Sequence, residues 1–268
     1  MKQNSLILRF DLSLPLAMAM AALVAMPSAE ATDLYWDVNG ATPGFSTVVN
    51  FWNDTNAFWN TDSTGGAGTL SAVTTSADDL FISQATTNTG NITLNGPTKN
   101  ASSITFLANV GPTVSLTSGG TINIGGTGAF SGIRQQSTGG NAIASALLLN
   151  SGNTAFNFSN SSTGLLTIGG VVTGTATPGN VTQMLTIGSS SSGGITMSAI
   201  EDVSGSATKV ALTVNNTDTG ITTLTGASTY TGGTTISAGT LSVGSGSTSG
   251  SIEGDVANSG TLTFNRTN

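Results

Sequence analysis

Apolar and polar side chains alternate over short runs through most of the chain. In residues 224–244 the apolar positions Ile236, Leu241 and Val243 stand among Thr, Ser and Gly. Residues 239–243 alternate as a half-buried strand does, because successive side chains of a strand point to opposite faces. Their sequence, GTLSV, returns as GTLTF 21 residues later. A short strand that returns at this period is typical of a solenoid, whose coils bury their apolar faces only against one another.

A five-residue frame of Gly, any residue, apolar, any residue, apolar recurs along the chain and is clearest at its end. We predict that the third and fifth residues of each frame point inward and stack along one core: Ile92, Leu94, Ile122, Ile124, Leu166, Ile168, Leu241, Val243, Leu262 and Phe264. Strands are predicted at residues 92–94, 103–107, 113–116, 121–124, 146–149, 155–158, 165–168, 184–187, 195–197, 210–214 and 221–224.

The composition agrees with an all-β fold. The chain of 268 residues contains 36 Gly, and only 7% of its residues are charged. Thr is suited to the outward face of a strand and Gly to sharp corners between strands. Because no helical periodicity follows the N-terminal region, we predict a β-solenoid over residues 65–268, clearest at 224–264.

The N-terminal residues 1–31 have the pattern of a secretory signal peptide. Lys2 and Arg9 charge the front, residues 12–26 are mostly apolar, and Ala-Glu-Ala at 29–31 supplies a small-x-small cleavage site. A transmembrane anchor is the alternative, but the apolar run is short and is interrupted by Ser and Pro. We therefore expect an exported protein.

Residues 32–64 are rich in aromatic side chains and contain every Trp of the chain, Trp36, Trp52 and Trp59. One interpretation is an N-terminal cap, since an open solenoid end exposes both apolar core and unpaired strand edges. The other is a glycan-binding platform built from the three Trp rings, because flat aromatic faces beside Asp and Asn suit the apolar face and the hydroxyls of a sugar.

The absence of two residue types, Cys and His, excludes several kinds of catalytic and metal site. The chain has no Cys and no His, which removes disulfides, thiol catalysis, His-based triads and His-ligated zinc. With a net charge of −7 and only six Lys and Arg, nucleic acid is not an expected partner. The acidic clusters at 37–40 and 53–56 are interpreted as Asx turns, not calcium loops, so we expect no cofactor and no metal.

The amino-acid sequence of the clearest repeat resembles that of a known family. Residues 229–243 read Thr-Tyr-x-Gly-Gly-Thr-x-Ile-x-x-Gly-Thr-Leu-x-Val and resemble the autotransporter-associated beta strand repeat of bacterial passenger regions. The resemblance implies a right-handed parallel β-helix that is exported and displayed outside the cell. Members often begin with a similar Trp-Asp and Phe-Trp-Asn-rich segment, which favours the cap interpretation of residues 32–64.

The resemblance implies a cellular location but no particular catalytic activity. We predict a secreted or surface-displayed passenger or stalk segment that contributes to adhesion or matrix contact, without catalysis. An extracellular glycan-binding module is the alternative, and a β-helical polysaccharide lyase or hydrolase, with acids such as Glu201 and Asp202, is the third. The abrupt ending favours a fragment of a larger passenger over a short secreted relative, and such a fragment would reach a membrane only through a barrel missing from this chain. Self-association through an open solenoid end is also expected.

Overall fold

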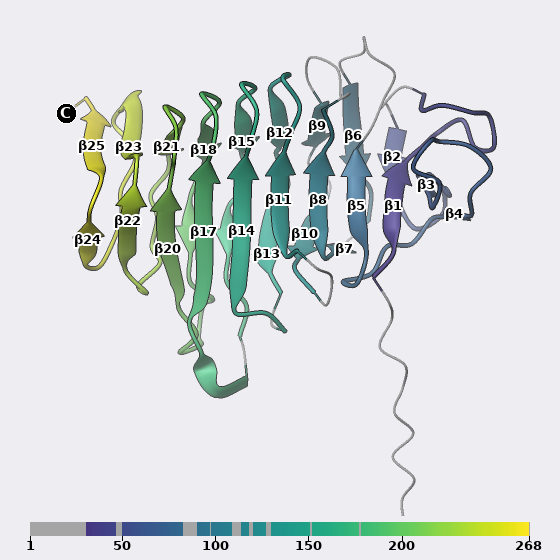
Figure 1. The fold of residues 1–268 in the computed structure, drawn as a ribbon. Coiled ribbons are helices and arrows are strands. Elements are labelled where there is room, and N and C mark those ends of the chain that lie inside the picture. The colour runs from purple at the N-terminus through teal and green to yellow at the C-terminus, as the bar shows by residue number, and fades with distance from the viewer. Residues whose placement is uncertain are drawn as a thin grey trace, which may run out of the picture.

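The computed structural model describes residues 31–46, 50–82, 90–96, 98–108, 114–117, 120–126, 130–150, 152–176 and 178–267. The predicted signal peptide, apart from its last residue, lies outside the described residues. Within them the chain forms a β-solenoid of about seven turns, as predicted, and one 3-10 turn at Pro178–Asn180 interrupts the strands (Figure 1). No helix in this part of the chain is long and apolar enough to span a membrane.

Three sheets run along the axis of the solenoid. Sheet A contains, in spatial order, β4 (Leu70–Ser71), β3 (Trp59–Asn60), β1 (Asp33–Trp36), β5 (Asp79–Ile82), β8 (Ser103–Phe106), β11 (Gly132–Gln135), β14 (Ala155–Asn160), β17 (Gln183–Ser189), β20 (Val210–Asn215), β22 (Thr234–Ala238) and β24 (Val256–Asn258). Sheet B contains β2 (Asn50–Trp52), β6 (Gly90–Leu94), β9 (Val114–Thr117), β12 (Asn141–Ile143), β15 (Leu166–Ile168), β18 (Ile195–Met197), β21 (Ile221–Leu224), β23 (Thr240–Ser247) and β25 (Thr261–Arg266). Sheet C contains β7 (Thr98–Ala101), β10 (Thr121–Ile124), β13 (Ala146–Leu149), β16 (Val172–Thr173) and β19 (Ile200–Glu201).

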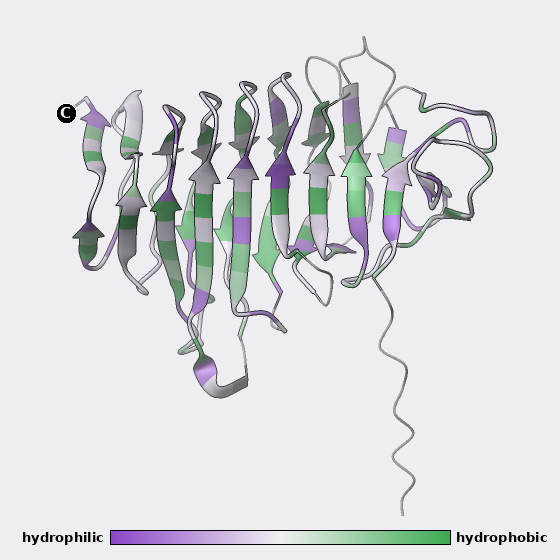
Figure 2. Cartoon of the chain, in the orientation of Figure 1, coloured by the Kyte–Doolittle hydropathy of each residue, from purple (hydrophilic) through white to green (hydrophobic). Residues whose placement is uncertain are grey.

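The core lies between the sheets and is filled by the inward side chains of each strand. Figure 2 shows the alternation of apolar and polar residues along the strands. Most of the predicted inward residues are buried, including Ile92, Leu94 and Leu166. They line two walls and not one, because Ile122 and Ile124 belong to sheet C, whereas the other frames belong to sheet B.

Phe264 is a correction to the predicted core. Its side chain is 65% exposed, and Leu262 is only partly buried. Both residues belong to β25, which pairs with β23 on one side and has no strand on its other side among the described residues. A stacked coil buries its inward side chains only when a neighbour lies on each side of it. The frame therefore predicts the direction of a side chain but not its burial.

The cross-section of the solenoid changes after β19, the last strand of sheet C. In the next coil, Thr229 N donates to Ile200 O at 2.9 Å, so the chain still passes over β19 but forms no strand there. The fully buried Tyr230 follows directly, and its ring belongs to the core. Gly232 then packs so closely that a Cβ would lie 2.4 Å from Val210 O. The Tyr-x-Gly-Gly segment thus closes the core where the third sheet ends.

The N-terminal end of sheet A has a different construction. β1 is parallel to β5, but β3 pairs antiparallel with β1, and β4 pairs antiparallel with β3. The short antiparallel strands therefore cover the edge of the parallel sheet at this end (Figure 1). A covered edge cannot pair with a strand from another molecule.

Candidate functional site

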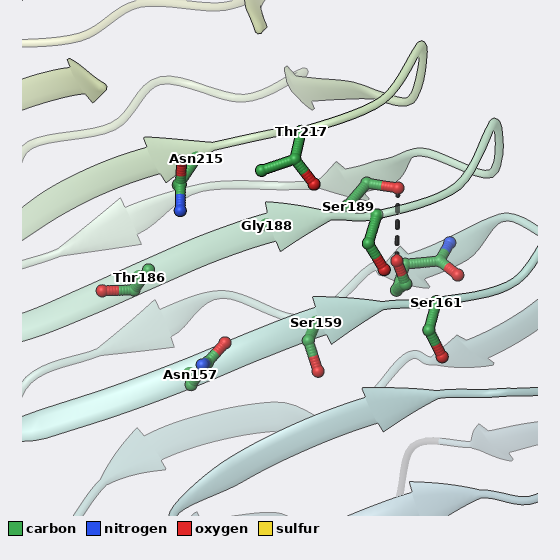
Figure 3. A pocket seen from close by; sticks show the side chains of 10 residues that line it. Asn157, Ser159, Ser161, Thr186, Gly188, Ser189, Asn215 and Thr217 are labelled. Atoms are coloured by element: carbon green, nitrogen blue, oxygen red, sulfur yellow. Dashed lines mark hydrogen bonds between the residues drawn. The ribbon is translucent and has the colours of Figure 1, made fainter. Parts of the chain in front are cut away.

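A groove lies on the outer face of sheet A. It has a volume of about 220 Å³ and lies across β14, β17 and β20 (Figure 3). Its lining residues are Asn157, Ser159, Asn160, Ser161, Thr186, Gly188, Ser189, Ser190, Asn215 and Thr217. None of them is charged or aromatic, so the groove is lined by hydroxyl groups, amide groups and backbone.

Strand alternation and register create this groove. On β14, Phe156 and Phe158 point into the core, so Asn157 and Ser159 point outward. Ser159 pairs with Gly188 on β17, which has no side chain to fill the space between its neighbours. A Cβ at Gly188 would lie 2.8 Å from the backbone oxygen of Asn215 on the next strand. The floor of the groove therefore depends on glycine at this position.

Buried polar residues fix one end of the groove, where sheet A turns toward sheet B. Asn160 is 1% exposed, and its amide donates to Gly164 O at 2.8 Å and to Gly194 O, in the next coil, at 2.9 Å. Asn216 accepts from Ser189 N at 3.0 Å, which joins one more coil to the series. These hydrogen bonds satisfy the backbone at the corner and hold successive coils in register.

The outward side chains of the groove have no such partners. Among the described residues, six lining side chains make no hydrogen bond within the protein: Asn157, Ser159, Thr186, Ser190, Asn215 and Thr217. Ser161 differs, because its hydroxyl donates to Gln135 O at 3.3 Å. Amides and hydroxyls both donate and accept hydrogen bonds. The groove can therefore bind a neutral, hydroxyl-rich ligand, whereas acid–base catalysis would need titratable groups that its lining does not provide.

The structure places the three Trp of the predicted glycan platform in the core. Trp36, Trp52 and Trp59 are each 1% exposed. Trp59 packs edge-on against both of the others, with ring centroids 5.1 Å from Trp36 and 5.2 Å from Trp52. Their ring faces contact protein, and a sugar cannot stack on a ring that is covered on every side. They form an apolar cluster at the N-terminal end and no platform at the surface.

A second aromatic group lies on the outer face of sheet A near its N-terminal end. Tyr35 stacks on Phe81 with centroids 4.8 Å apart and on Phe45 with centroids 6.2 Å apart. Next to this stack, Asp33 is the register partner of Asp79. Burial and the negative charge of Asp79 raise the pKa of Asp33 above its ordinary value. The facing surfaces of the stacked rings are occupied by one another.

The acidic clusters that could have indicated calcium are turns, as predicted. Asp37 Oδ1 accepts from Asn39 N at 3.1 Å, and Asn53 Oδ1 accepts from the backbone of Thr55 and Asn56. Among the described residues, no group of three or more acids, His or Cys could hold a metal ion.

Asp202, one of the acids considered for a hydrolase, is occupied by hydrogen bonds within the protein. It accepts from Val210 N at 2.6 Å and from the backbone N–H and hydroxyl of Thr231 at 3.0 and 2.7 Å. Glu201 precedes it at the end of β19. A carboxylate that already accepts three hydrogen bonds from the protein is arranged to join coils, and its role in this structure is structural.

Comparison with known proteins identifies the repeat. Residues 214–243 match the family described as passenger-associated-transport-repeat. A segment of 82 residues, 31% of this chain, is 37% identical to "Adhesin BmaC autotransporter" of Brucella suis biovar 1 (strain 1330), and the match covers 2% of that protein. No solved structure matches the chain. The matched residues 214–243 run from the end of β20 to the middle of β23, and they include Tyr230, Gly232 and Gly233.

Proposed function

We propose that this autotransporter passenger-like repeat protein is a structural segment of a surface-displayed adhesin, which holds extracellular glycan or matrix surfaces through many weak contacts and performs no catalysis. The observation that carries the proposal is the outer face of sheet A. Thr186, Thr213 and Thr235 are register partners there, one on each successive coil. The similarity to a protein named as an adhesin supports the same role.

The spacing of the outward side chains explains how weak contacts can add up. Neighbouring strands lie about 4.8 Å apart, and one outward column presents Asn157, Thr186, Thr213 and Thr235 on four successive coils. A single neutral hydrogen bond to a surface group contributes little, because it replaces a hydrogen bond to water. When many such groups are fixed on one rigid scaffold, binding of the first raises the effective concentration of the others.

Adhesion can be tested with the folded chain coupled to beads. We expect beads that carry the protein to be retained under flow on surfaces coated with extracellular glycan or matrix protein, and beads that carry heat-denatured protein to be released. Because the contacts are mostly uncharged, raising the salt concentration should change retention by less than about twofold. Release of the folded-protein beads from every coating would overturn the proposal.

The absence of catalysis has its own measurement. We expect no release of reducing ends or of unsaturated uronate from neutral and acidic polysaccharides, with or without added calcium. The controls are a known lyase and a known hydrolase in the same assay. Turnover that survives purification of the folded protein and that is lost in Asp202→Asn would establish an enzyme in place of a structural segment.

A further inference from the structure

We infer that the groove across β14, β17 and β20 is a binding site for a neutral glycan segment. The inference rests on the proposed adhesive function and names the ligand class for one part of the surface. The groove combines a hollow of about 220 Å³ with side chains from three coils. It therefore brings hydroxyl and amide groups of three successive coils together in one place.

The geometry places hydrogen-bonding groups on both sides of a clear floor. Asn157 and Ser159 come from β14, Gly188 forms the floor on β17, and Asn215 stands on β20 (Figure 3). Thr217 continues the wall beyond Asn215. A bound group above Gly188 can reach the Ser159 hydroxyl on one side and the Asn215 amide on the other, because the neighbouring strands lie only about 4.8 Å away.

The chemistry of the lining selects among ligand classes. The unpaired amides and hydroxyls offer donors and acceptors together, which matches the hydroxyl groups of a sugar. The lining contains no Lys or Arg for a phosphate or sulfate and no carboxylate for a cation. It also has no large apolar side chain that would anchor a lipid or an apolar peptide side chain. A neutral glycan is the extracellular polymer that fits this combination.

The position of the groove within sheet A argues against a peptide bound as an added strand. β14, β17 and β20 are interior strands, and each is paired on both edges. A peptide that adds a strand needs an open sheet edge. The groove is also smaller than the pockets of about 300–1,000 Å³ that hold drug-sized molecules. It therefore fits a short part of a glycan, while the rest of the polymer extends along the outward columns of the same sheet.

The test is a titration of isotopically labelled full chain with three neutral hexasaccharides (maltohexaose, cellohexaose and mannohexaose), followed by amide chemical shifts. We expect at least one of them to shift the backbone amides of Asn157, Gly188 and Asn215 in a saturable way. A hexamer of galacturonate serves as the charged comparison and should give at least fivefold weaker binding. No saturable shift with any neutral hexasaccharide would overturn the inference, as would shifts confined to residues outside the groove.

A matched pair of variants separates the groove from the general surface. The double variant N157A/N215A removes both amides from the groove and should weaken binding at least tenfold. The control N91A/N265A removes two exposed Asn side chains from β6 and β25 of sheet B and should stay within twofold of the original chain. Equal weakening in both variants would overturn the assignment to the groove. Thr186→Val, which keeps the shape but removes a hydroxyl, provides an independent test and should weaken binding about threefold.

The bead assay distinguishes failure of this inference from failure of the proposed function. Retention of beads on coated surfaces without any hexasaccharide binding would overturn the groove assignment alone. Saturable hexasaccharide binding at the groove, with no bead retention on any surface, would overturn the adhesive function and leave the glycan site. Loss of both would overturn both.

Discussion

Lys99 is a charged residue in an otherwise apolar inward column. It lies on β7, next to Ile122 in the register of sheet C, and its side chain is 2% exposed. Its ammonium group contacts Asp54 Oδ1 at 2.6 Å, and the side chain of Asp54 is 56% exposed. The pair therefore connects the first strand of sheet C to the N-terminal segment. A buried charge is tolerated when it is paired, and removal of its partner is costly.

We predict that changing the exposed member of this pair destabilises the protein more than changing the buried one. Asp54→Ala leaves the ammonium buried without the ion pair and should lower the free energy of unfolding by about 1–3 kcal/mol. Lys99→Met keeps an apolar side chain of similar length in the column and should change the free energy of unfolding by less than about 1 kcal/mol. Chemical denaturation of both variants beside the original chain measures the difference. A larger loss in Lys99→Met would contradict this account of the pair.

Tyr230 predicts a pH dependence of stability. Its hydroxyl lies 2.6 Å from Thr234 Oγ1, and burial raises its pKa from 10 to about 12, although the hydrogen bond to Thr234 opposes the shift. Because the folded pKa exceeds the unfolded one, the stabilisation is fully present below pH 10 and is lost as pH rises toward 12. The expected loss is about 3 kcal/mol, from roughly 1.4 kcal/mol for each pKa unit.

The measurement compares denaturation midpoints of the original chain and Tyr230→Phe at pH 8 and pH 11.5. The variant should be less stable at pH 8 by about 1 kcal/mol, because the hydroxyl of Thr234 loses its partner. It should also lose less stability between the two pH values. Tyr35, whose pKa is raised by burial and by Asp33, is present in both proteins and cancels in the comparison. Parallel loss in both proteins would exclude Tyr230 as the cause.

At the scale of the element, β14 provides a direct test of how the two faces of a strand differ. Asn160 and Asn157 belong to the same strand, but Asn160 is buried at the corner and Asn157 is exposed. Asn160→Ala removes two hydrogen bonds to Gly164 O and Gly194 O and one from Ser162 N. We predict a loss of about 2–4 kcal/mol, because buried backbone groups are left without partners. Asn157→Ala should change stability by less than about 0.5 kcal/mol.

Thermal or urea denaturation of the two variants checks this contrast. Asn→Ala is the same chemical change at both positions, so differences in side-chain type cannot explain the result. Similar destabilisation by both variants would mean that the corner hydrogen bonds do not hold the coils together.

The sequence predicts strands well where inward positions are apolar. The strands at 121–124, 146–149, 195–197 and 221–224 coincide with β10, β13, β18 and β21. The sequence pattern does not predict β7 and β11, because their inward residues Lys99 and Gln135 are polar and interrupt the alternation of apolar and polar positions. Both side chains are buried because they have polar partners: Asp54, 45 residues away, pairs with Lys99, and the backbone of Ser137 and Gly139 accepts hydrogen bonds from Gln135.

The groove could not be predicted from the sequence for a related reason. Ser159 pairs with Gly188 across 29 residues, whereas Gln183 pairs with Val210 across 27. Coils of unequal length hide which outward residues become neighbours. The Trp cluster presents the same difficulty, since the antiparallel strand β3 brings Trp59 back against Trp36. Aromatic content alone could not decide between a buried cluster and an exposed platform.

At the scale of the whole molecule, the two ends of the solenoid differ. Among the described residues, β24 and β25 each have one edge that faces no other strand, and so do β2 and β4 at the N-terminal end, but the edge strand of sheet A there is the two-residue antiparallel β4. At the end formed by β24 and β25, Phe264 is 65% exposed and Val256 is 37% exposed. Unpaired edges beside apolar side chains favour pairing with another strand. We propose that a second copy of this chain can occupy this end.

The proposal predicts association that depends on protein concentration. Sedimentation velocity of the chain should show a growing dimer fraction as concentration rises. Phe264→Lys should reduce this fraction at least fivefold, because an edge lysine disfavours strand pairing. Val73→Lys, a change at an exposed apolar residue of the N-terminal region, serves as the control and should leave association unchanged. A monomer at every concentration would refute pairing through this end.

The end of sheet C after β19 also changes how much polypeptide the rod needs for its length. Gln183 pairs with Val210 across 27 residues, but Thr240 pairs with Thr261 across only 21. Each coil advances the rod by about 4.8 Å whatever its circumference. A two-sheet coil therefore extends roughly 30% farther for every residue that is synthesised and exported, and arrays of such coils are an economical way to reach away from a cell.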